Sequence, residues 1–396
     1  MTKKTPSKLF YLALIMLSIG GLISTEIYIT SFKAMSDYYE VDISNIQSSI
    51  PVFLLALSIS QLIYGPISDF LGRKLVLVIG ITIWCLTSLS ICFSTHIDQL
   101  IFLRMLQGVG ACAGMTVSRA IIADTFSKEE GYKIYLTIFP FVGMSPALAP
   151  MIGRTLHNYF GWKSNFIFIF IFASIALLLT FVIIEESLNK QQRKKVKLSH
   201  FINNLCSTFK NKNFIYYSMI PCFGYAVYFA YITDATIILM KYGVKKEYLG
   251  NYFLTLSLTY VLGNIYARKL INSMNVEKTI FIGYIFFTLG SFLFFLTTRM
   301  IVVNEILLIA SISIVTFGNG FLLPLGTSRA ISSSNELSGT ASGVIGSLQL
   351  GSAAISSYIV SSMIGENVIK LGNFIVILSI IAFCLFYNKY KRNNYD

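Results

Sequence analysis

Twelve stretches of about 20 mostly apolar residues follow one another along this chain, and each is long enough to cross a bilayer as an α-helix. The 396 residues are 55% hydrophobic and 12% charged, whereas about 25% of the residues of a soluble domain are charged. The predicted spans are 9–31, 46–64, 75–94, 99–123, 134–156, 164–184, 214–240, 248–267, 279–297, 303–326, 337–362 and 370–388. The sequence therefore predicts an all-α membrane protein with twelve transmembrane helices in the lipid bilayer.

The longest polar break between these spans covers residues 185–213 and carries seven Lys and Arg residues. It divides the twelve predicted helices into six and six, as in many secondary transporters that are built from two structural repeats. We therefore expect an N-terminal six-helix bundle at residues 1–190, a basic cytoplasmic linker at 191–213 and a C-terminal six-helix bundle at 214–396.

The positive charges of the chain are distributed unevenly between the predicted loops. If both termini are cytoplasmic, 21 of the 31 Lys and Arg residues fall in cytoplasmic loops and tails, and 8 in external loops or at the outer ends of the predicted helices. Short cytoplasmic loops accumulate such residues, so the net charge of +13 is explained without a nucleic-acid partner. The sequence predicts a protein of the cytoplasmic (inner) membrane with both termini inside.

The six cysteines and three histidines of the chain are scattered. Their spacing fits neither a metal site nor a disulfide framework. We therefore expect no metal site and no catalytic residue. We also expect that the protein has no bound cofactor and is a monomer.

A short polar segment at residues 64–74 lies between two uncharged apolar runs, and we expect it to form a cytoplasmic turn of about ten residues. A glycine lets neighbouring helices approach, the acid can meet a helix N-terminus, and the two bases can pair with acids or with anionic lipid heads. The residues are Gly65, Asp69, Gly72, Arg73 and Lys74. The segment is either a conformational gate or an ordinary basic loop.

Three ionisable residues lie inside predicted helices, where charges are costly and usually functional. Glu26, Arg104 and Asp234 each lie about five or six residues from the outer end of their helix, which places them roughly 8–9 Å below the outer membrane boundary at 1.5 Å per residue. We interpret them as a candidate proton-coupling site. The alternative, side chains that extend to the water interface, applies best to the long Arg104.

Aromatic residues accompany two of these positions and are candidates for substrate binding, because aromatic faces bind cations and flat apolar molecules. They could equally be ordinary packing residues. The candidates are Tyr28 and Phe32 near Glu26, and Tyr225, Tyr228, Phe229 and Tyr231, which we expect near one face of the helix that carries Asp234.

Two segments resemble signatures of the major facilitator superfamily. The spacing G-x-x-x-D-x-x-G-R-K at residues 65–74 is similar to the loop signature between its helices 2 and 3, and residues 103–111 resemble its helix-4 motif. The resemblance implies that Arg104 is linked to proton transfer and that Asp124 is the acid that partners Arg73. The loop after the eighth helix has Ala267 where an acid would match Asp69, so the predicted gate is concentrated in the N-terminal half.

A further segment is similar to the helix-5 signature of antiporters in that superfamily. Its matching residues are Gly143, Pro146, Pro150 and Gly153, whereas Arg154 stands where a second glycine is usual.

Three shorter segments resemble the bicyclomycin-resistance (Bcr/CflA) group of the superfamily: residues 61–66, Gly161-Trp162 and residues 186–188. The first helix of that group carries an acid followed by tyrosine and proline. Here Glu26-Ile27-Tyr28 is followed by Thr30 in place of the proline.

The resemblance implies the major facilitator fold, with two pseudo-symmetric six-helix bundles. It also implies a secondary active transporter, a proton-driven antiporter that exports small organic compounds such as drugs by alternating access. The proton gradient would be its energy source, and protons and the substrate its small partners.

Other functions remain open. One is a dedicated exporter or importer of a metabolite or siderophore with the same fold, and another is a membrane receptor that transports nothing. An integral-membrane enzyme is disfavoured, because the sequence has no cluster of His, Asp or Ser at a predicted membrane surface.

Overall fold

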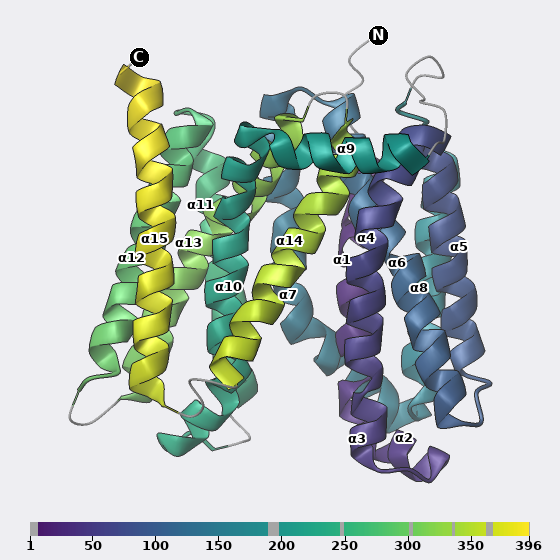
Figure 1. The fold of residues 1–396 in the computed structure, drawn as a ribbon. Coiled ribbons are helices and arrows are strands. Elements are labelled where there is room, and N and C mark those ends of the chain that lie inside the picture. The colour runs from purple at the N-terminus through teal and green to yellow at the C-terminus, as the bar shows by residue number, and fades with distance from the viewer. Residues whose placement is uncertain are drawn as a thin grey trace. The chain divides into compact units, whose positions relative to one another are not determined.

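The computed structural model describes residues 7–188, 198–245, 249–300, 304–334, 337–361 and 367–395, and every regular element in them is helical (Figure 1). Twelve long helices lie on the twelve predicted spans, which confirms the predicted all-α class. They are α1 (Lys8–Glu26), α4 (Ser49–Leu71), α5 (Arg73–Ile91), α6 (Ile97–Thr125), α7 (Lys128–Phe160), α8 (Lys163–Ile183), α10 (Lys212–Lys241), α11 (Leu249–Leu270), α12 (Val276–Thr297), α13 (Glu305–Ser332), α14 (Ser338–Ile359) and α15 (Val368–Tyr395).

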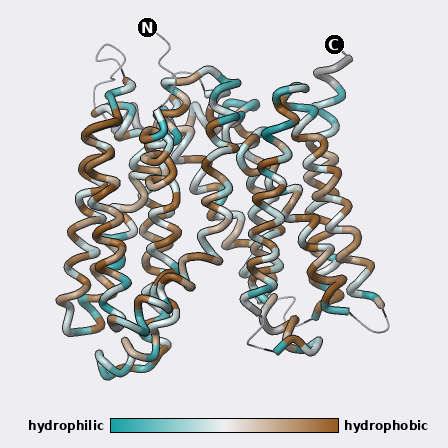
Figure 2. The backbone as a smooth tube through the Cα atoms, turned by 180° about the vertical axis from the view of Figure 1, so that it is seen from behind, coloured by the Kyte–Doolittle hydropathy of each residue, from teal (hydrophilic) through white to brown (hydrophobic). Residues whose placement is uncertain are grey.

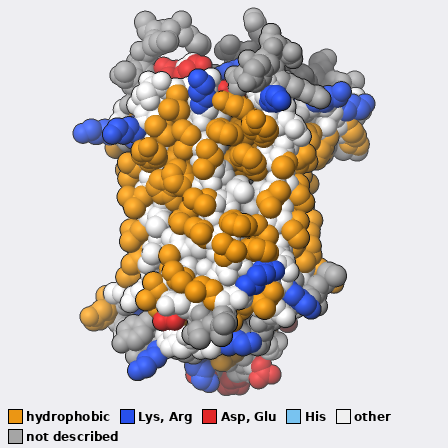
Figure 3. Space-filling view, turned by 90° about the vertical axis from the view of Figure 1, so that its left-hand side faces the viewer, with side chains coloured by type: hydrophobic (Ala, Val, Ile, Leu, Met, Phe, Trp, Pro, Cys, Tyr) orange, Lys and Arg blue, Asp and Glu red, His pale blue; other side chains and the backbone are white. Residues whose placement is uncertain are grey.

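Membrane insertion follows from the composition of these helices. Ten helical segments of the described residues are long and apolar enough to cross a bilayer, and the centres of the long helices are hydrophobic (Figure 2). One face of the molecule is a band of apolar side chains with Lys and Arg above and below it (Figure 3). The α14 helix is less apolar because it is rich in serine and glycine. The protein is thus an integral membrane protein.

Four short elements were not predicted from the sequence. After α1 the chain forms a 3-10 helix η1 (Ile29–Ser31), then α2 (Phe32–Tyr39) and α3 (Ile43–Gln47), and α9 (Leu198–Lys210) lies in the predicted linker. Helix α1 therefore ends at Glu26, so this acid lies at a helix end and not inside a longer helix.

The described chain forms two compact units. Unit 1 comprises residues 1–127, 145–210 and 334–347, and unit 2 comprises residues 128–144, 211–333 and 348–396. Helices α7 and α14 each contribute their first part to one unit and their remainder to the other. The division at residues 191–213 that the sequence suggests remains a prediction.

The two units repeat the same packing order. In unit 1, α6 packs against α1, α4 and α5, and α5 packs against α8. In unit 2, α13 packs in the same way against α10, α11 and α12, and α12 packs against α15. The repeated order is that of the two pseudo-symmetric bundles expected for this fold.

Two glycines show the same repeat at the level of single contacts. A Cβ atom on Gly110 of α6 would lie 2.4 Å from the backbone nitrogen of Trp84 on α5. A Cβ atom on Gly318 of α13 would lie 2.6 Å from the backbone nitrogen of Phe287 on α12. Because neither position has room for a side chain, both helix pairs pack backbone against backbone.

Candidate functional site

Arg104 lies on α6 and is fully buried in unit 1. Its Nη1 donates to the carbonyl oxygen of Ser24 at 2.9 Å and to Oε1 of Gln107. Its guanidinium carbon lies 4.5 Å from the ring centroid of Tyr28 and 4.3 Å from that of Phe53. Two aromatic faces and two neutral acceptors therefore surround this cation, so Arg104 does not extend to the water interface.

Further hydrogen bonds hold the partners of Arg104 in place. Trp84 donates through its indole N–H to the hydroxyl oxygen of Ser24 at 3.0 Å, and the amide nitrogen of Gln107 donates to the hydroxyl oxygen of Ser88 at 2.7 Å. These partners were not predicted from the sequence. Gln107 could have been found, because it lies three residues after Arg104 on the same helix face.

Glu26 lies two residues after Ser24 at the end of α1 and is half-buried. Its Oε2 atom is buried and accepts no hydrogen bond from any residue that the structure describes. Among those residues, no ion pair joins a carboxylate to Arg104. Glu26 and Arg104 thus approach the same turn of α1 without direct pairing.

The two aromatic candidates beside Glu26 are packed together. The rings of Tyr28 and Phe32 lie edge to face with centroids 5.3 Å apart, and the hydroxyl of Tyr28 lies 2.6 Å from that of Ser49. Tyr28 is fully buried. It therefore serves as one wall of the Arg104 site.

The aromatic candidates on α10 do not share one face. Tyr225 and Phe229 stack with ring centroids 6.0 Å apart, and Tyr228 contacts the edge of Phe229. Tyr231 instead packs in the core of unit 2 against Phe294, with centroids 5.9 Å apart. The difference arises because residues four apart on a helix lie on one face, whereas residues six apart do not.

Asp234 lies on α10 and is largely buried, with 7% of its surface exposed. It belongs to unit 2, whereas Glu26 and Arg104 belong to unit 1.

The polar segment at residues 64–74 is not the predicted ten-residue turn. Helix α4 continues through Asp69 to Leu71, and only Gly72 separates it from Arg73, the first residue of α5. Gly72 has a φ of 101°, which L-residues rarely adopt and which ends the helix abruptly. Asp69 and Arg73 are therefore held on two rigid helix ends.

Arg73 is fully buried and joins two acids in unit 1. Its Nη2 lies 2.7 Å from Oδ1 of Asp69, and its Nε lies 2.8 Å from Oδ2 of Asp124. Its Nη1 also donates to the hydroxyl oxygen of Ser68 at 2.6 Å. The arginine is satisfied on all sides, as a buried charge requires.

The same carboxylates hold the first turn of α14. Asp69 accepts hydrogen bonds from the backbone nitrogens of Gly339 at 3.2 Å and Thr340 at 2.9 Å, and from the Thr340 hydroxyl at 2.6 Å. Ser338 donates to Asp124 and accepts from Arg73. The negative charge thus lies at a helix N-terminus, where the helix dipole favours it.

Two further gate candidates, Gly65 and Lys74, make close helix contacts. A Cβ atom on Gly65 would lie 2.4 Å from the carbonyl oxygen of Gly339, so the bare backbone lets α4 and α14 meet. Lys74 donates through Nζ to the carbonyl oxygen of Phe181 near the end of α8. Glu186, which was not predicted to be part of the gate, accepts a hydrogen bond from the backbone nitrogen of Arg73 at 2.9 Å.

Unit 2 contains a second charge cluster, which was not predicted from the sequence. Arg329, in the last turn of α13, lies 2.7 Å from Glu277, in the first turn of α12. Arg329 also donates to the hydroxyl of Tyr132 at 3.1 Å, and its guanidinium lies 5.1 Å from the ring of Tyr217. Tyr132 is in the first part of α7, the part that belongs to unit 2. A basic residue in a last helical turn and an acid in a first turn were the available signals.

The helix-5 motif lies within the continuous helix α7, at the place where the helix passes from one unit to the other. A Cβ atom on Gly143 would lie 2.1 Å from the ring of Tyr260, in unit 2. A Cβ atom on Gly153 would lie 1.6 Å from the carbonyl oxygen of Ile27, in unit 1. Pro146 and Pro150 lie between these two glycines.

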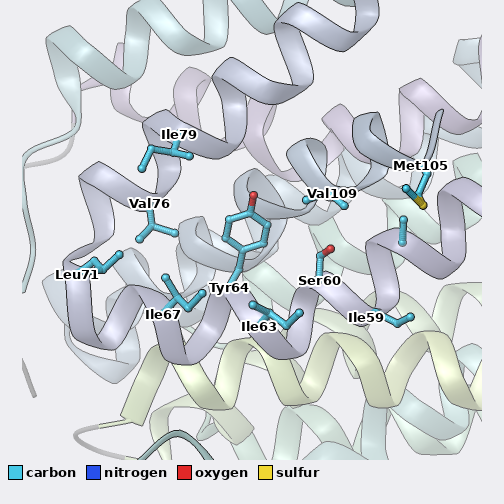
Figure 4. A pocket seen from close by; sticks show the side chains of 11 residues that line it. Ile59, Ser60, Ile63, Tyr64, Ile67, Leu71, Val76, Ile79, Met105 and Val109 are labelled. Atoms are coloured by element: carbon cyan, nitrogen blue, oxygen red, sulfur yellow. The ribbon is translucent and has the colours of Figure 1, made fainter. Parts of the chain in front are cut away.

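A groove of about 480 Å³ lies between α4, α5 and α6 (Figure 4). Its lining is apolar apart from Ser60 and the hydroxyl of Tyr64. It offers no charged group to a substrate and is distinct from the Arg104 site. Among the described residues no group of His, Cys, Asp and Glu is arranged to hold a metal ion.

Comparison with known proteins identifies the family. The model of the Major Facilitator Superfamily matches residues 12–357. The chain belongs to this superfamily. The predicted family is thus confirmed, and the chain is a membrane transporter for a small-molecule substrate.

Relatives within the superfamily match almost the whole chain. The bicyclomycin resistance protein homolog of Haemophilus influenzae is 26% identical over 371 residues, which are 92% of this chain and 91% of that protein. Multidrug resistance protein D of Escherichia coli is 25% identical over 354 residues, 87% of each chain. These matches agree with the predicted bicyclomycin-resistance type.

A solved structure supports the superfamily fold. The crystal structure of the human organic anion transporter MFSD10 aligns with a TM-score of 0.65 and 15% sequence identity, over 97% of this chain and 100% of that chain. At this identity the likeness concerns the fold alone.

Proposed function

We propose that this protein is a proton-coupled antiporter that exports small organic compounds, drugs among them, by alternating access. The observation that carries the proposal is the buried Arg104 beside Glu26, because ionisable groups at membrane depth mark ion and proton pathways. The names of the bicyclomycin-resistance and multidrug-resistance relatives support the substrate class. The proposed activity is transport, with no enzymatic reaction. The transporter would act as a monomer, and the proton gradient would be its only energy source.

Glu26 is the proposed proton carrier. One of its carboxylate oxygens is buried without a hydrogen-bond donor, so a proton gained from water would remove an uncompensated buried charge. Arg104 is held as a fixed cation by Tyr28 and Phe53 and keeps the local potential positive. Substrate and proton would then compete for the ionised form of Glu26, and Asp234 would tune which charged compounds are accepted.

The two charge clusters are the proposed conformational gates. Asp69, Arg73 and Asp124 hold the start of α14, and Arg329 holds the start of α7 through Tyr132. Both helices contribute to both units. A rocking motion between two bundles would therefore require that these helix starts be released.

The proposed location is the cytoplasmic membrane, with both termini inside. The bias of 21 of 31 basic residues toward one side supports it. A fluorescent or enzymatic reporter placed after Asp396 is expected to report a cytoplasmic position. A signal from the external side of the membrane would contradict the orientation.

The test of coupling is uphill transport in proteoliposomes with an imposed pH gradient, after a screen for transported compounds. Wild type is expected to concentrate substrate only when the gradient is present. Glu26→Gln is expected to retain binding of neutral compounds and to lose gradient-driven accumulation. The matched control is Glu40→Gln, since Glu40 is exposed.

Two outcomes would contradict the proposal. If Glu26→Gln accumulates substrate at the wild-type rate, Glu26 is not the coupling acid, and Asp234 becomes the next candidate. If wild type transports equally without the gradient, the protein is not a proton antiporter.

A further inference from the structure

Helix α9 exposes three apolar side chains and buries two polar ones. Asn204 and Thr208 are buried, at 7% and 2% exposure. Ile202 and Phe209 are about half exposed, at 51% and 46%, and Cys206 is also exposed. An ordinary surface helix turns its apolar stripe toward the protein core, whereas these three apolar side chains of α9 are exposed.

The exposed apolar residues of α9 form one stripe and the exposed polar residues another. Ile202, Cys206 and Phe209 are spaced at i, i+4 and i+7, which places them on one side of a helix with 3.6 residues per turn. The exposed residues Asn203, Ser207 and Lys210 have the same spacing one residue later. The helix therefore has three sectors: one toward the protein, one apolar and one polar.

The position of α9 in the fold explains three sectors. The helix lies crosswise at the end of α4 and contacts that helix (Figure 1). In sequence it lies between two membrane-spanning helices, α8 and α10. A helix at the end of a transmembrane bundle lies at the level where hydrocarbon gives way to water, so its two exposed sectors meet different surroundings.

We propose that α9 is an interfacial helix that inserts Ile202, Cys206 and Phe209 between the phospholipids of one leaflet. Lys210 and Lys212 meet the anionic head groups of that leaflet, and five further bases precede the helix in sequence at positions 190–197. Apolar side chains beside basic ones are typical of helices that lie in the plane of an anionic membrane.

A phospholipid leaflet fits this surface better than a protein partner does. Three side chains on a 13-residue helix offer far less than the roughly 800 Å² that each partner of a stable protein complex buries. The leaflet is present wherever the protein is inserted. This inference depends on membrane insertion and not on the proposed transport function.

Collision measurements on spin labels test the inference in the full-length protein. Cys206 is labelled in a Cys384→Ser background, because Cys384 is the other exposed cysteine of the described residues. The matched control carries the label one residue later, in a Cys206→Ser, Ser207→Cys, Cys384→Ser variant. Both proteins are reconstituted in phosphatidylcholine vesicles with and without phosphatidylglycerol.

The label at position 206 is expected to collide several-fold more often with oxygen, which concentrates in lipid, than with a water-soluble nickel chelate. The label at position 207 should show the opposite preference. Phosphatidylglycerol should increase the difference, and Lys210→Gln should weaken that dependence. If both labels collide equally with the nickel chelate in both lipid mixtures, α9 lies in water and the inference is wrong.

Discussion

The sharpest prediction concerns Asp69, whose carboxylate both pairs with Arg73 and accepts from the first turn of α14. The substitution Asp69→Asn keeps the size of the side chain and removes its charge. An amide offers one acceptor oxygen in place of two, and its NH2 group must face a donor. At least one of the bonds to Gly339, Thr340 or Arg73 is therefore lost.

The magnitude follows from burial. Asp69 is 4% exposed and Arg73 is fully buried, and removing one partner of a buried ion pair costs about 3–5 kcal/mol. Asp124 still pairs with Arg73, so the lower end applies. A loss of about 3 kcal/mol weakens the closed arrangement of this cluster about 150-fold.

Amide hydrogen exchange measures this loss directly. The first N–H groups of an α-helix have no acceptor within the helix, so the protection of the Gly339 and Thr340 amides depends on Asp69. We expect faster exchange of both amides in Asp69→Asn, slower transport, and substrate affinity within a few fold of wild type.

The matched control for this experiment is Asp37→Asn. Asp37 also accepts an i,i+4 ion pair, from Lys33, but both side chains are exposed, where such pairs contribute at most about 1 kcal/mol. Exchange at Gly339 and Thr340 should stay at the wild-type rate in this control. Wild-type protection of these amides in Asp69→Asn would refute the assigned role of the carboxylate.

Three further predictions concern single positions. Arg104→Lys should abolish gradient-driven transport without lowering the melting temperature of the protein by more than a few degrees, since an ammonium cannot span two rings and two acceptors; normal transport would exclude a special role for the guanidinium. Arg329→Gln should slow transport less than Asp69→Asn does, because the pair with Glu277 is partly exposed, and adding Glu277→Gln should restore part of the rate. Gly153→Ala should lower the melting temperature, because its Cβ would overlap a carbonyl oxygen of unit 1, whereas Gly351→Ala, which meets nothing within 4 Å, should not.

The sequence alone predicted the twelve helices because each span has to satisfy one strong physical requirement. A segment that crosses hydrocarbon must be long, apolar and helical, since its backbone groups find no water there. This requirement applies only within the hydrocarbon, so the ends of the helices were less predictable. The charge of Asp69 suggested a loop, yet α4 continues to Leu71 because the acid is neutralised by Arg73 and by the start of α14.

The partners of Arg104 show a second limit. Depth counting placed Arg104 and Glu26 at a similar level, and the structure brings them to the same turn of α1. Besides the ring of Tyr28, the direct neighbours of the guanidinium are a backbone carbonyl, Gln107 and the Phe53 ring. Every residue has a backbone carbonyl, so the sequence does not show which carbonyl accepts the bond. Likewise, nothing in the sequence distinguishes Phe53 from the other phenylalanines among the 32 in the chain.

The residues that carry the repeat between the two halves are small. Gly110 and Gly318 occupy equivalent positions in α6 and α13, where two backbones meet, while the charges at the helix ends are not repeated in kind. Unit 1 has a base at the start of α5 and an acid at the end of α6, and unit 2 has an acid, Glu277, in the first turn of α12 and a base, Arg329, in the last turn of α13. An ion pair keeps its attraction when its charges are exchanged. The fold therefore requires that the two positions carry opposite charges, but it does not determine which position is acidic and which is basic.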